Sequence, residues 1–351
     1  MSTSVSAPVE SNRESAATKS CRFTAVIIGR NEEQFIGGAI QSLLKLRAEV
    51  PDAEIIFVDS ASRDRSVEVA KNFPITILQL PADWPLGVGA GRFTGYRWSH
   101  GEYIFFLDGD AVAEAKWLKE AMEFLDKHPD YAAVAGVLDE EYVDAQGVHN
   151  GGAPNVFGQD LSQDVIDSKV LGGIAMYRRS VLEQVGTVHP FLPTAEDHEL
   201  CLRIRRGGWK VARLKGRMAI KYTEDRNTLY EVLRRARTKM YDYGAVLKYC
   251  QQYGAGWQYC IDTIPYLVSF ALVITTFIAA IPVAIYFGKL LWLVAAAVAL
   301  FLAIAAKKRS FKGALLSIAV RSVSLFKTIL SYVRTTPKSP TEYPTDVIHV
   351  Q

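Results

Sequence analysis

Two aspartates separated by one glycine, Asp108 and Asp110, follow an apolar run that reads EYIFFL. Carboxylates spaced in this way can both face a hard divalent cation, and the glycine lets the backbone turn tightly. Mg²⁺ or Mn²⁺ held there would keep positions open for phosphate oxygens. The pair could equally be a solvated turn, but its place at the end of a predicted buried strand favours the metal.

A third aspartate, Asp59, ends another apolar run, EIIFVD. Its carboxylate could accept hydrogen bonds from a nucleotide base or a ribose hydroxyl. The alternative is an acidic cap for the helix expected near Arg65, and Asp64 has the better spacing for that role.

An arginine closes the glycine-rich stretch 87–92, which opens a predicted helix but departs from the dinucleotide-binding pattern. A helix start that carries Arg92 could face a diphosphate. Otherwise, the stretch is a turn followed by a surface arginine.

The acidic pair Glu196-Asp197 opens the predicted helix 196–206. Helix electrostatics favours acids in the first turn, which is a sufficient structural reason for the pair. A carboxylate at a helix N-terminus also stays ionised near neutral pH. It could therefore act as a general base and accept the proton of an acceptor hydroxyl.

Strand-like and helical patterns alternate in the region that must position these residues, 22–250. Apolar runs that suit strands cover residues 23–28, 54–59, 75–80 and 103–107. Helical patterns cover residues 35–46, 66–72 and 89–99. The alternation predicts an α/β fold with a mostly parallel, Rossmann-like sheet flanked by helices. Because ligands bind beyond the carboxyl ends of such strands, the polar residues there should share one crevice.

The composition narrows the class of protein. The chain has 351 residues, of which 49% are hydrophobic, and a formal net charge of +3. These values exclude a collagen-like, disulfide-rich or wholly disordered chain. Residues 201–260 hold 14 basic and 4 acidic residues, a local charge of +10 that suggests an anionic partner. A nucleic acid is not expected, because this basic region adjoins an apolar segment and shows no nucleic-acid motif.

Two uncharged segments, about 265–287 and 290–306, are long enough to cross a bilayer and are joined by two residues. They predict a C-terminal transmembrane hairpin within a membrane region 251–310. Both flanks are basic, which places them on the cytoplasmic side. A hairpin buried in a soluble protein is the alternative.

The remaining segments are predicted from composition. Residues 311–334 read as a basic amphipathic helix in the membrane interface, because Arg321 near the middle of a third span would be costly. Residues 1–21 lack an apolar core and are expected to be a disordered N-terminal tail. The Pro/Thr/Ser-rich residues 335–351 are likewise expected to be a disordered tail.

Together, the motifs resemble the family 2 glycosyltransferases, which are inverting enzymes with the GT-A fold. The resemblance covers about residues 22–245, and its five blocks occur in the family's order. They are TAVIIGRNEE (24–33), EIIFVDSASRDRS (54–66), GAGRFTGYRWSHGEYIFFLDGD (89–110), LGGIAMYRRSVLEQVG (171–186) and EDHELCLRIRRGGW (196–209).

The resemblance implies a donor site, a metal site and a catalytic pair. The donor site would comprise Asn31, Glu32, Asp59, Arg92 and Asp108. Asp110 would be the principal ligand of Mg²⁺ or Mn²⁺, with Asp108 on the metal or the ribose. Asp197 would be the catalytic base and Glu196 its partner.

The sequence departs from the family's pattern in two places. Ser60 and Ala61 follow Asp59, where paired acids are more usual, so the detailed donor contacts are open. The Gln-x-x-Arg-Trp signature of processive synthases is absent, and two spans cannot enclose a channel unaided. Addition of a single sugar is therefore expected.

The expected activity is transfer from a nucleotide diphosphate sugar to a hydroxyl of a lipid-linked glycan on a polyprenyl diphosphate. It would occur at the cytoplasmic face of the inner (plasma) membrane, in surface or exopolysaccharide assembly, and a homo-oligomer is compatible with it. Transfer to a polyprenyl phosphate, which needs no base, is one alternative. A non-catalytic membrane scaffold that binds nucleotide sugars is the other.

Overall fold

The computed structural model describes residues 21–144, 147–223, 234 and 237–351. It has two compact units. The sheet unit comprises Met1–Asp225 together with Lys338–Gln351, and the helical unit comprises Arg226–Pro337. The predicted N-terminal tail, 1–21, lies outside the described residues except for Cys21.

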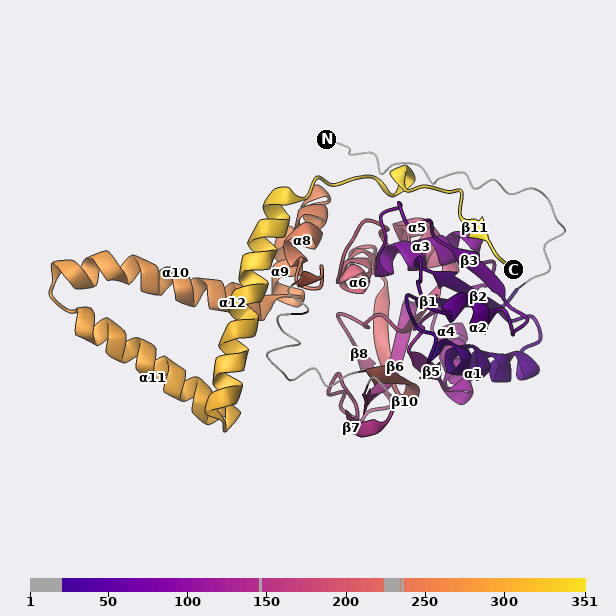
Figure 1. Ribbon diagram of the computed structural model, residues 1–351, viewed down its shortest axis with the longest axis horizontal. Coiled ribbons are helices and arrows are strands. Elements are labelled where there is room, and N and C mark those ends of the chain that lie inside the picture. Colours follow the sequence, from indigo (N-terminus) through magenta and orange to yellow (C-terminus); the bar gives the residue numbers. More distant parts are fainter. Residues whose placement is uncertain (1–20, 145–146, 224–233, 235–236) are drawn as a thin grey trace. The chain divides into compact units, whose positions relative to one another are not determined.

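A mixed sheet forms the centre of the sheet unit (Figure 1). Along the described residues its strand order is β11-β3-β2-β1-β4-β9-β6-β10-β5, with β7 paired to β6 and β8 to β10. The strands are β1 (Phe23–Gly29), β2 (Glu54–Asp59), β3 (Thr76–Gln79), β4 (Tyr103–Asp108), β5 (Ala111–Ala113), β6 (Tyr131–Val143), β7 (His149–Ala153), β8 (Val165–Asp167), β9 (Ala175–Arg178), β10 (Lys210–Thr223) and β11 (Ile348–His349). The helices are α1 (Ile36–Glu49), α2 (Ser66–Ala70), α3 (Val88–Trp98), α4 (Ala115–Lys127), α5 (Arg179–Val185) and α6 (Glu196–Arg206).

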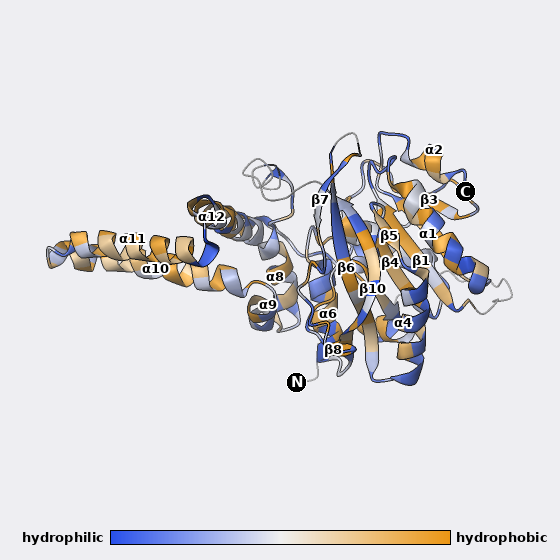
Figure 2. Ribbon diagram, turned by 90° about the horizontal axis from the view of Figure 1, so that it is seen from below, coloured by the Kyte–Doolittle hydropathy of each residue, from blue (hydrophilic) through white to orange (hydrophobic). Residues whose placement is uncertain are grey.

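The first four strands are parallel to one another, which confirms the predicted α/β fold. The register pairs Gly29 with Asp59 and Ile28 with Asp108, so the carboxyl ends of β1, β2 and β4 are level. Both alternating sets of side chains in these strands are buried, as expected for a sheet covered on both faces. Figure 2 shows this apolar centre.

The second half of the sheet is mixed. Strand β9 runs antiparallel to both β4 and β6, whereas β6 and β10 are parallel. Strand β5 pairs antiparallel with β10 through Ala111 and Lys221. This pairing brings Lys221, 113 residues along the chain from Asp108, next to the end of β4.

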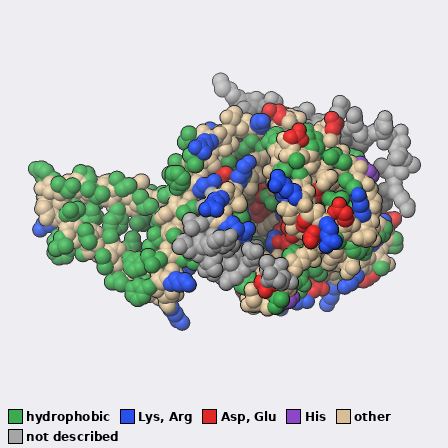
Figure 3. Space-filling view, in the orientation of Figure 1, with side chains coloured by type: hydrophobic (Ala, Val, Ile, Leu, Met, Phe, Trp, Pro, Cys, Tyr) green, Lys and Arg blue, Asp and Glu red, His purple; other side chains and the backbone are tan. Residues whose placement is uncertain are grey.

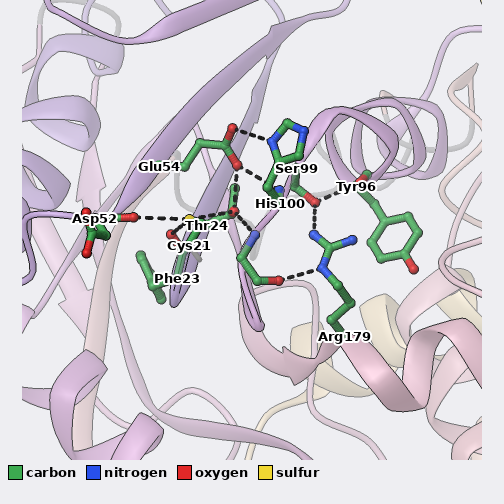
Figure 4. Close-up of polar contacts among 10 residues, drawn as sticks. Cys21, Phe23, Thr24, Asp52, Glu54, Tyr96, Ser99, His100 and Arg179 are labelled. Carbon is green, nitrogen blue, oxygen red and sulfur yellow. Dashed lines mark hydrogen bonds and ion pairs between the residues drawn. The ribbon is translucent and has the colours of Figure 1, made fainter. Parts of the chain in front are cut away.

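A polar network fixes the opposite, amino ends of the strands (Figure 4). Thr24 Oγ1 donates to Glu54 Oε2 at 2.7 Å, and the same carboxylate oxygen accepts from the His100 backbone N–H at 2.9 Å. Arg179 donates from Nε to the carbonyl of Gly101 and from Nη2 to Ser99 Oγ. The network holds the turn before β4, at the end of the sheet opposite Asp59 and Asp108.

The helical unit contains α8 (Tyr243–Gln252), α9 (Gly256–Asp262), α10 (Pro265–Tyr286), α11 (Leu290–Lys308) and α12 (Phe311–Arg334). Helices α10, α11 and α12 are each long and apolar enough to cross a membrane. Figure 3 shows a nearly continuous hydrophobic surface on α10 and α11, which are the predicted hairpin. The segment predicted to lie in the interface, α12, thus also meets the length and composition of a span.

The helical unit starts earlier than the predicted boundary at residue 250. Helix α8 and the turn before it bind α12. Asp242 Oδ1 lies 3.2 Å from Lys327 Nζ, and Tyr332 OH donates to Gln251 Oε1 at 2.9 Å. The predicted domain 22–250 therefore extends too far, since α8 belongs to the helical unit. Local sequence patterns do not reveal this boundary, because the contacts join residues about 80 positions apart.

The chain after α12 corrects another expectation. Residues 338–351, here called the C-terminal strap, belong to the sheet unit and are not a disordered tail. Strand β11 pairs antiparallel with the edge strand β3, as Figure 1 shows. Tyr343 is 2% exposed. The open backbone groups of an edge strand provide partners that the composition of the tail does not reveal.

Candidate functional site

Asp108, the last residue of β4, forms ion pairs with two basic side chains. Its Oδ1 accepts from Arg92 Nη2 at 2.7 Å, and its Oδ2 accepts from Lys221 Nζ at 2.6 Å. Burial alone would raise the pKa of Asp108, but Lys221 and Arg92 lower it to about 2. The carboxylate is therefore fixed in its charged form.

Arg92 connects three elements of the sheet unit. It lies on α3, contacts Asp108 on β4 and forms a second ion pair through Nη1 with Glu196 Oε1 on α6. Arg92 and Glu196 are 3% and 4% exposed. Helix α3 can bring Arg92 this close because a Cβ at Gly95 would overlap the side chain of Val26 in β1.

Asp110 lies on the other side of Lys221, whose Nζ is 3.3 Å from Asp110 Oδ1. Apart from Lys221, no hydrogen-bond partner for this buried oxygen lies among the described residues. Burial and then the charge of Asp110 raise the pKa of the neighbouring Glu32 to about 8. Among the described residues no group of three His, Cys, Asp or Glu side chains forms a ready metal site. A buried carboxylate oxygen next to a single ammonium nevertheless has the chemistry that a hard cation prefers in a ligand.

We expect Asp110→Asn to weaken the binding of Mn²⁺ alone at least tenfold, because the amide carries no charge to offset the dehydration of the ion. Isothermal titration calorimetry on the full chain measures the effect. Asp130→Asn is the matched control, since Asp130 pairs with Lys210 on the surface. If Asp110→Asn and the parent bind Mn²⁺ with equal affinity, Asp110 is not a ligand of the metal.

Asp59 is fully buried and is held by its own loop. It accepts hydrogen bonds from the backbone and hydroxyl of Ser62 and, at 2.9 Å, from Gln79 Nε2. Asp64 accepts from the backbone N–H and the hydroxyl of Ser66 at the start of α2. The N-cap residue of α2 is Arg65, however, and it makes no side-chain cap hydrogen bond. Asp59 thus shapes the loop after β2, and any donor contact would come in addition.

Asn31 joins the loops that follow β1 and β2. Its backbone N–H donates to Ser62 Oγ, and its Oδ1 accepts from the Arg63 backbone N–H. Left-handed backbone occurs at Asn31 (φ 60°), Ala61 (φ 58°) and Ala195 (φ 50°). Non-glycine residues with left-handed backbone are uncommon. They occur mostly at functional sites, where the surrounding structure holds them in this strained conformation.

Asp197 lies in the first turn of α6, directly after the strained Ala195 and Glu196. Its side chain is 13% exposed, and its Oδ2 is 3.6 Å from His198 Nε2. The charges of Glu196, Asp108 and Asp197 all act on the Arg92 guanidinium. Asp108 and Glu196 thus form ion pairs with this buried cation, and Asp197 lies near enough for its charge to act on it.

The sequence analysis missed Lys221 and Gln79. Lys221 lies two residues after buried Ala219 on β10, so both side chains lie on the same face of the sheet, but other basic residues on this strand hide the signal in the sequence. Gln79 ends β3 beside Asp59 and carries no motif. Only the pairing of the strands identifies it.

The family model described as "Glycosyl transferase family 2" matches residues 24–186. A poly(ribitol-phosphate) beta-N-acetylglucosaminyltransferase, TarS of Staphylococcus aureus, is 23% identical over 186 residues, which cover 50% of this chain and 31% of TarS. A poly(ribitol-phosphate) beta-glucosyltransferase of Bacillus spizizenii is 26% identical over 187 residues, covering 50% of this chain and 28% of that protein. The chain thus matches less than a third of either relative.

A solved structure has a similar fold over most of the chain. It is a mannosyltransferase from Pyrobaculum calidifontis in complex with GDP-Man and Mn²⁺, with a TM-score of 0.58 and 19% sequence identity. The similarity covers 90% of this chain and 88% of that one.

Proposed function

We propose that the chain, whose residues 24–186 match the glycosyl transferase family 2 model, moves one sugar from a nucleotide diphosphate sugar to a hydroxyl of a lipid-linked glycan. The observation that carries the proposal is the cluster of Asp108, Asp110 and Glu196 around Arg92 and Lys221. A buried group of acids and cations at the carboxyl ends of parallel strands suits a charged ligand such as a diphosphate.

The part of the site that would bind the nucleotide sugar, here called the donor end, lies at the carboxyl ends of β1, β2 and β4, which are level with one another. A divalent cation bound by Asp110 and Asp108 would neutralise the departing diphosphate. Lys221 adds a positive charge beside both carboxylates, and Arg92 holds Asp108 in place. The presence of GDP-Man and Mn²⁺ in the similarly folded mannosyltransferase is consistent with this assignment.

The transfer would be a single displacement with inversion. The acceptor oxygen bonds to the anomeric carbon while the bond from that carbon to the diphosphate oxygen breaks. Asp197 accepts the acceptor's proton, and the electron pair leaves with the nucleotide diphosphate. The Arg92–Glu196 pair fixes the first turn of α6, which carries Asp197.

The membrane assignment rests on the helical unit. Helices α10 and α11 are apolar along their length, and Lys307 and Lys308 end α11. Basic residues at span ends favour the cytoplasmic side. An enzyme anchored in this way has ready access to acceptors held in the bilayer, and the match to polymer-modifying relatives supports a glycan acceptor.

The test is an assay of the full chain in membrane vesicles with radiolabelled UDP- and GDP-sugars and Mn²⁺. We expect label from one donor to appear in the lipid extract, with much less for Asp110→Asn. A nucleotide sugar that raises the Tm of the chain without any transfer of label, in vesicles supplied with membrane lipids, would instead identify a non-catalytic binding protein.

A further inference from the structure

The C-terminal strap, residues 338–351, adds a strand to the sheet beside the donor end of the site. Ile348 pairs with Gln79 and His349 with Leu78. The Ile77 backbone N–H donates to the carbonyl of Gln351 at 2.7 Å, and the Val350 N–H donates to the carbonyl of Ile77 at 2.9 Å. The strap therefore holds the strand whose Gln79 side chain donates to Asp59.

Tyr343 is the buried anchor of the strap. Its ring makes edge contacts with Trp84, Phe93 and Phe191, at centroid distances of 5.6, 5.7 and 5.5 Å. Its hydroxyl donates to the carbonyl of Pro85 at 3.0 Å. Three aromatic contacts and a satisfied hydroxyl make a specific pocket.

Two of the three rings around Tyr343 belong to the segments that carry Arg92 and Glu196. Phe93 directly follows Arg92 on α3, and Phe191 lies in the loop that leads to Glu196 on α6. The same segments touch through backbone, because a Cβ at Gly89 would lie 3.2 Å from the carbonyl oxygen of Leu192. The Tyr343 side chain thus packs between α3, which carries Arg92, and the loop before α6, which leads to Glu196.

We infer that Tyr343 is a positioning residue of the transfer site and that the strap is needed for full activity. The inference rests on the proposed function. Without the Tyr343 ring, α3 and the loop before α6 lose the side chain that packs against both, so the two segments can separate. Arg92 then no longer fixes the first turn of α6, which carries Asp197. A displacement of about 1 Å in a catalytic group can lower a rate about 10²-fold. The strap continues directly from α12 through residues 335–337, so this support comes from the chain that leaves the helical unit.

The experiment compares three variants of the full chain. We expect Tyr343→Ala to lower kcat at least tenfold while the KM for the nucleotide sugar changes less than threefold, at a temperature where the chain remains folded. Tyr343→Phe keeps the ring and should retain kcat within threefold. Ile348→Ala removes an apolar side chain of the same strap that is 49% exposed, and it should also retain kcat.

Hydrogen–deuterium exchange supplies a readout that does not depend on turnover. Tyr343→Ala should raise exchange at least tenfold in residues 88–98 and 187–195, with β6 unchanged. Unchanged exchange in both segments, or parental kcat in Tyr343→Ala, would overturn the inference. If the parent transfers no sugar while the exchange increases as expected, Tyr343 still fixes the two segments, but the proposed function fails and with it the role in transfer.

Discussion

Asp197→Asn is expected to lower kcat by about 10²–10⁴-fold, the usual effect of removing a general base. The amide has nearly the same shape as the carboxylate but cannot take the proton of an acceptor hydroxyl. The donor contacts proposed for Asp108 and Asp110 remain, so the Kd for the nucleotide sugar should stay within threefold. Steady-state rates at saturating acceptor and a donor titration measure the two quantities.

Glu199→Gln is the matched control for this variant. Glu199 lies in the same first turn of α6 but is bound by Arg203 through Nε at 2.7 Å and Nη2 at 2.8 Å. Its neutralisation should lower the Tm and leave kcat within threefold. Parental turnover by Asp197→Asn with a hydroxyl acceptor would show that Asp197 is not the base. A mild loss with a polyprenyl phosphate acceptor would favour that alternative, because a phosphate oxygen is already an anion.

Arg92→Met is expected to cause the largest loss of stability. The substitution keeps an unbranched side chain of similar reach but leaves the carboxylates of Asp108 and Glu196 without their shared cation. Breaking a buried ion pair from one side costs about 3–5 kcal/mol. For a unit of this size, that loss lowers Tm by roughly 10 °C. Thermal unfolding in detergent measures the change, with Arg97→Met at the exposed end of α3 as control.

The pH dependence of this defect follows from Glu196. Burial raises the pKa of its carboxyl and Arg92 opposes that shift, so removal of Arg92 raises the pKa further. A group whose pKa is higher in the folded state stabilises the fold at low pH and loses that contribution as pH rises. The Tm deficit of Arg92→Met should therefore be smaller at pH 5 than at pH 8.

A double substitution tests the same ion pair. Arg92→Met with Glu196→Gln removes both charges, so it should unfold at a higher temperature than Arg92→Met alone. Neighbouring groups that share an interaction do not contribute additively. A Tm lowered by the full sum of the single effects would contradict the ion pair as the source of the loss.

Much of the site could be predicted because its residues follow recognisable strands. The apolar runs before Asp59 and Asp108 place both residues at strand ends, and parallel strands bring such ends to one edge of the sheet. The position of Glu196 and Asp197 at a helix start is equally local, since it depends only on spacing within α6.

The C-terminal strap could not be predicted in this way. Its Pro, Thr and Ser content is typical of a disordered segment. Its order comes from the unpaired edge of β3 and from rings at Trp84, Phe93 and Phe191, all more than 150 residues away. The boundary of the helical unit was misplaced for the same reason, because α8 is held by the distant α12.

The sequence by itself determined the α/β alternation, the apolar helices and the acids at the strand ends, because each depends on periodicity or spacing over a few residues. Only the tertiary structure decided that Arg92 joins Asp108 to Glu196 and that Lys221 lies between Asp108 and Asp110. It also decided that Tyr343 packs against Phe93, the residue after Arg92. Ion pairs and ring contacts require side chains from distant segments to meet within a few ångströms, and the packing of the whole sheet unit sets those distances.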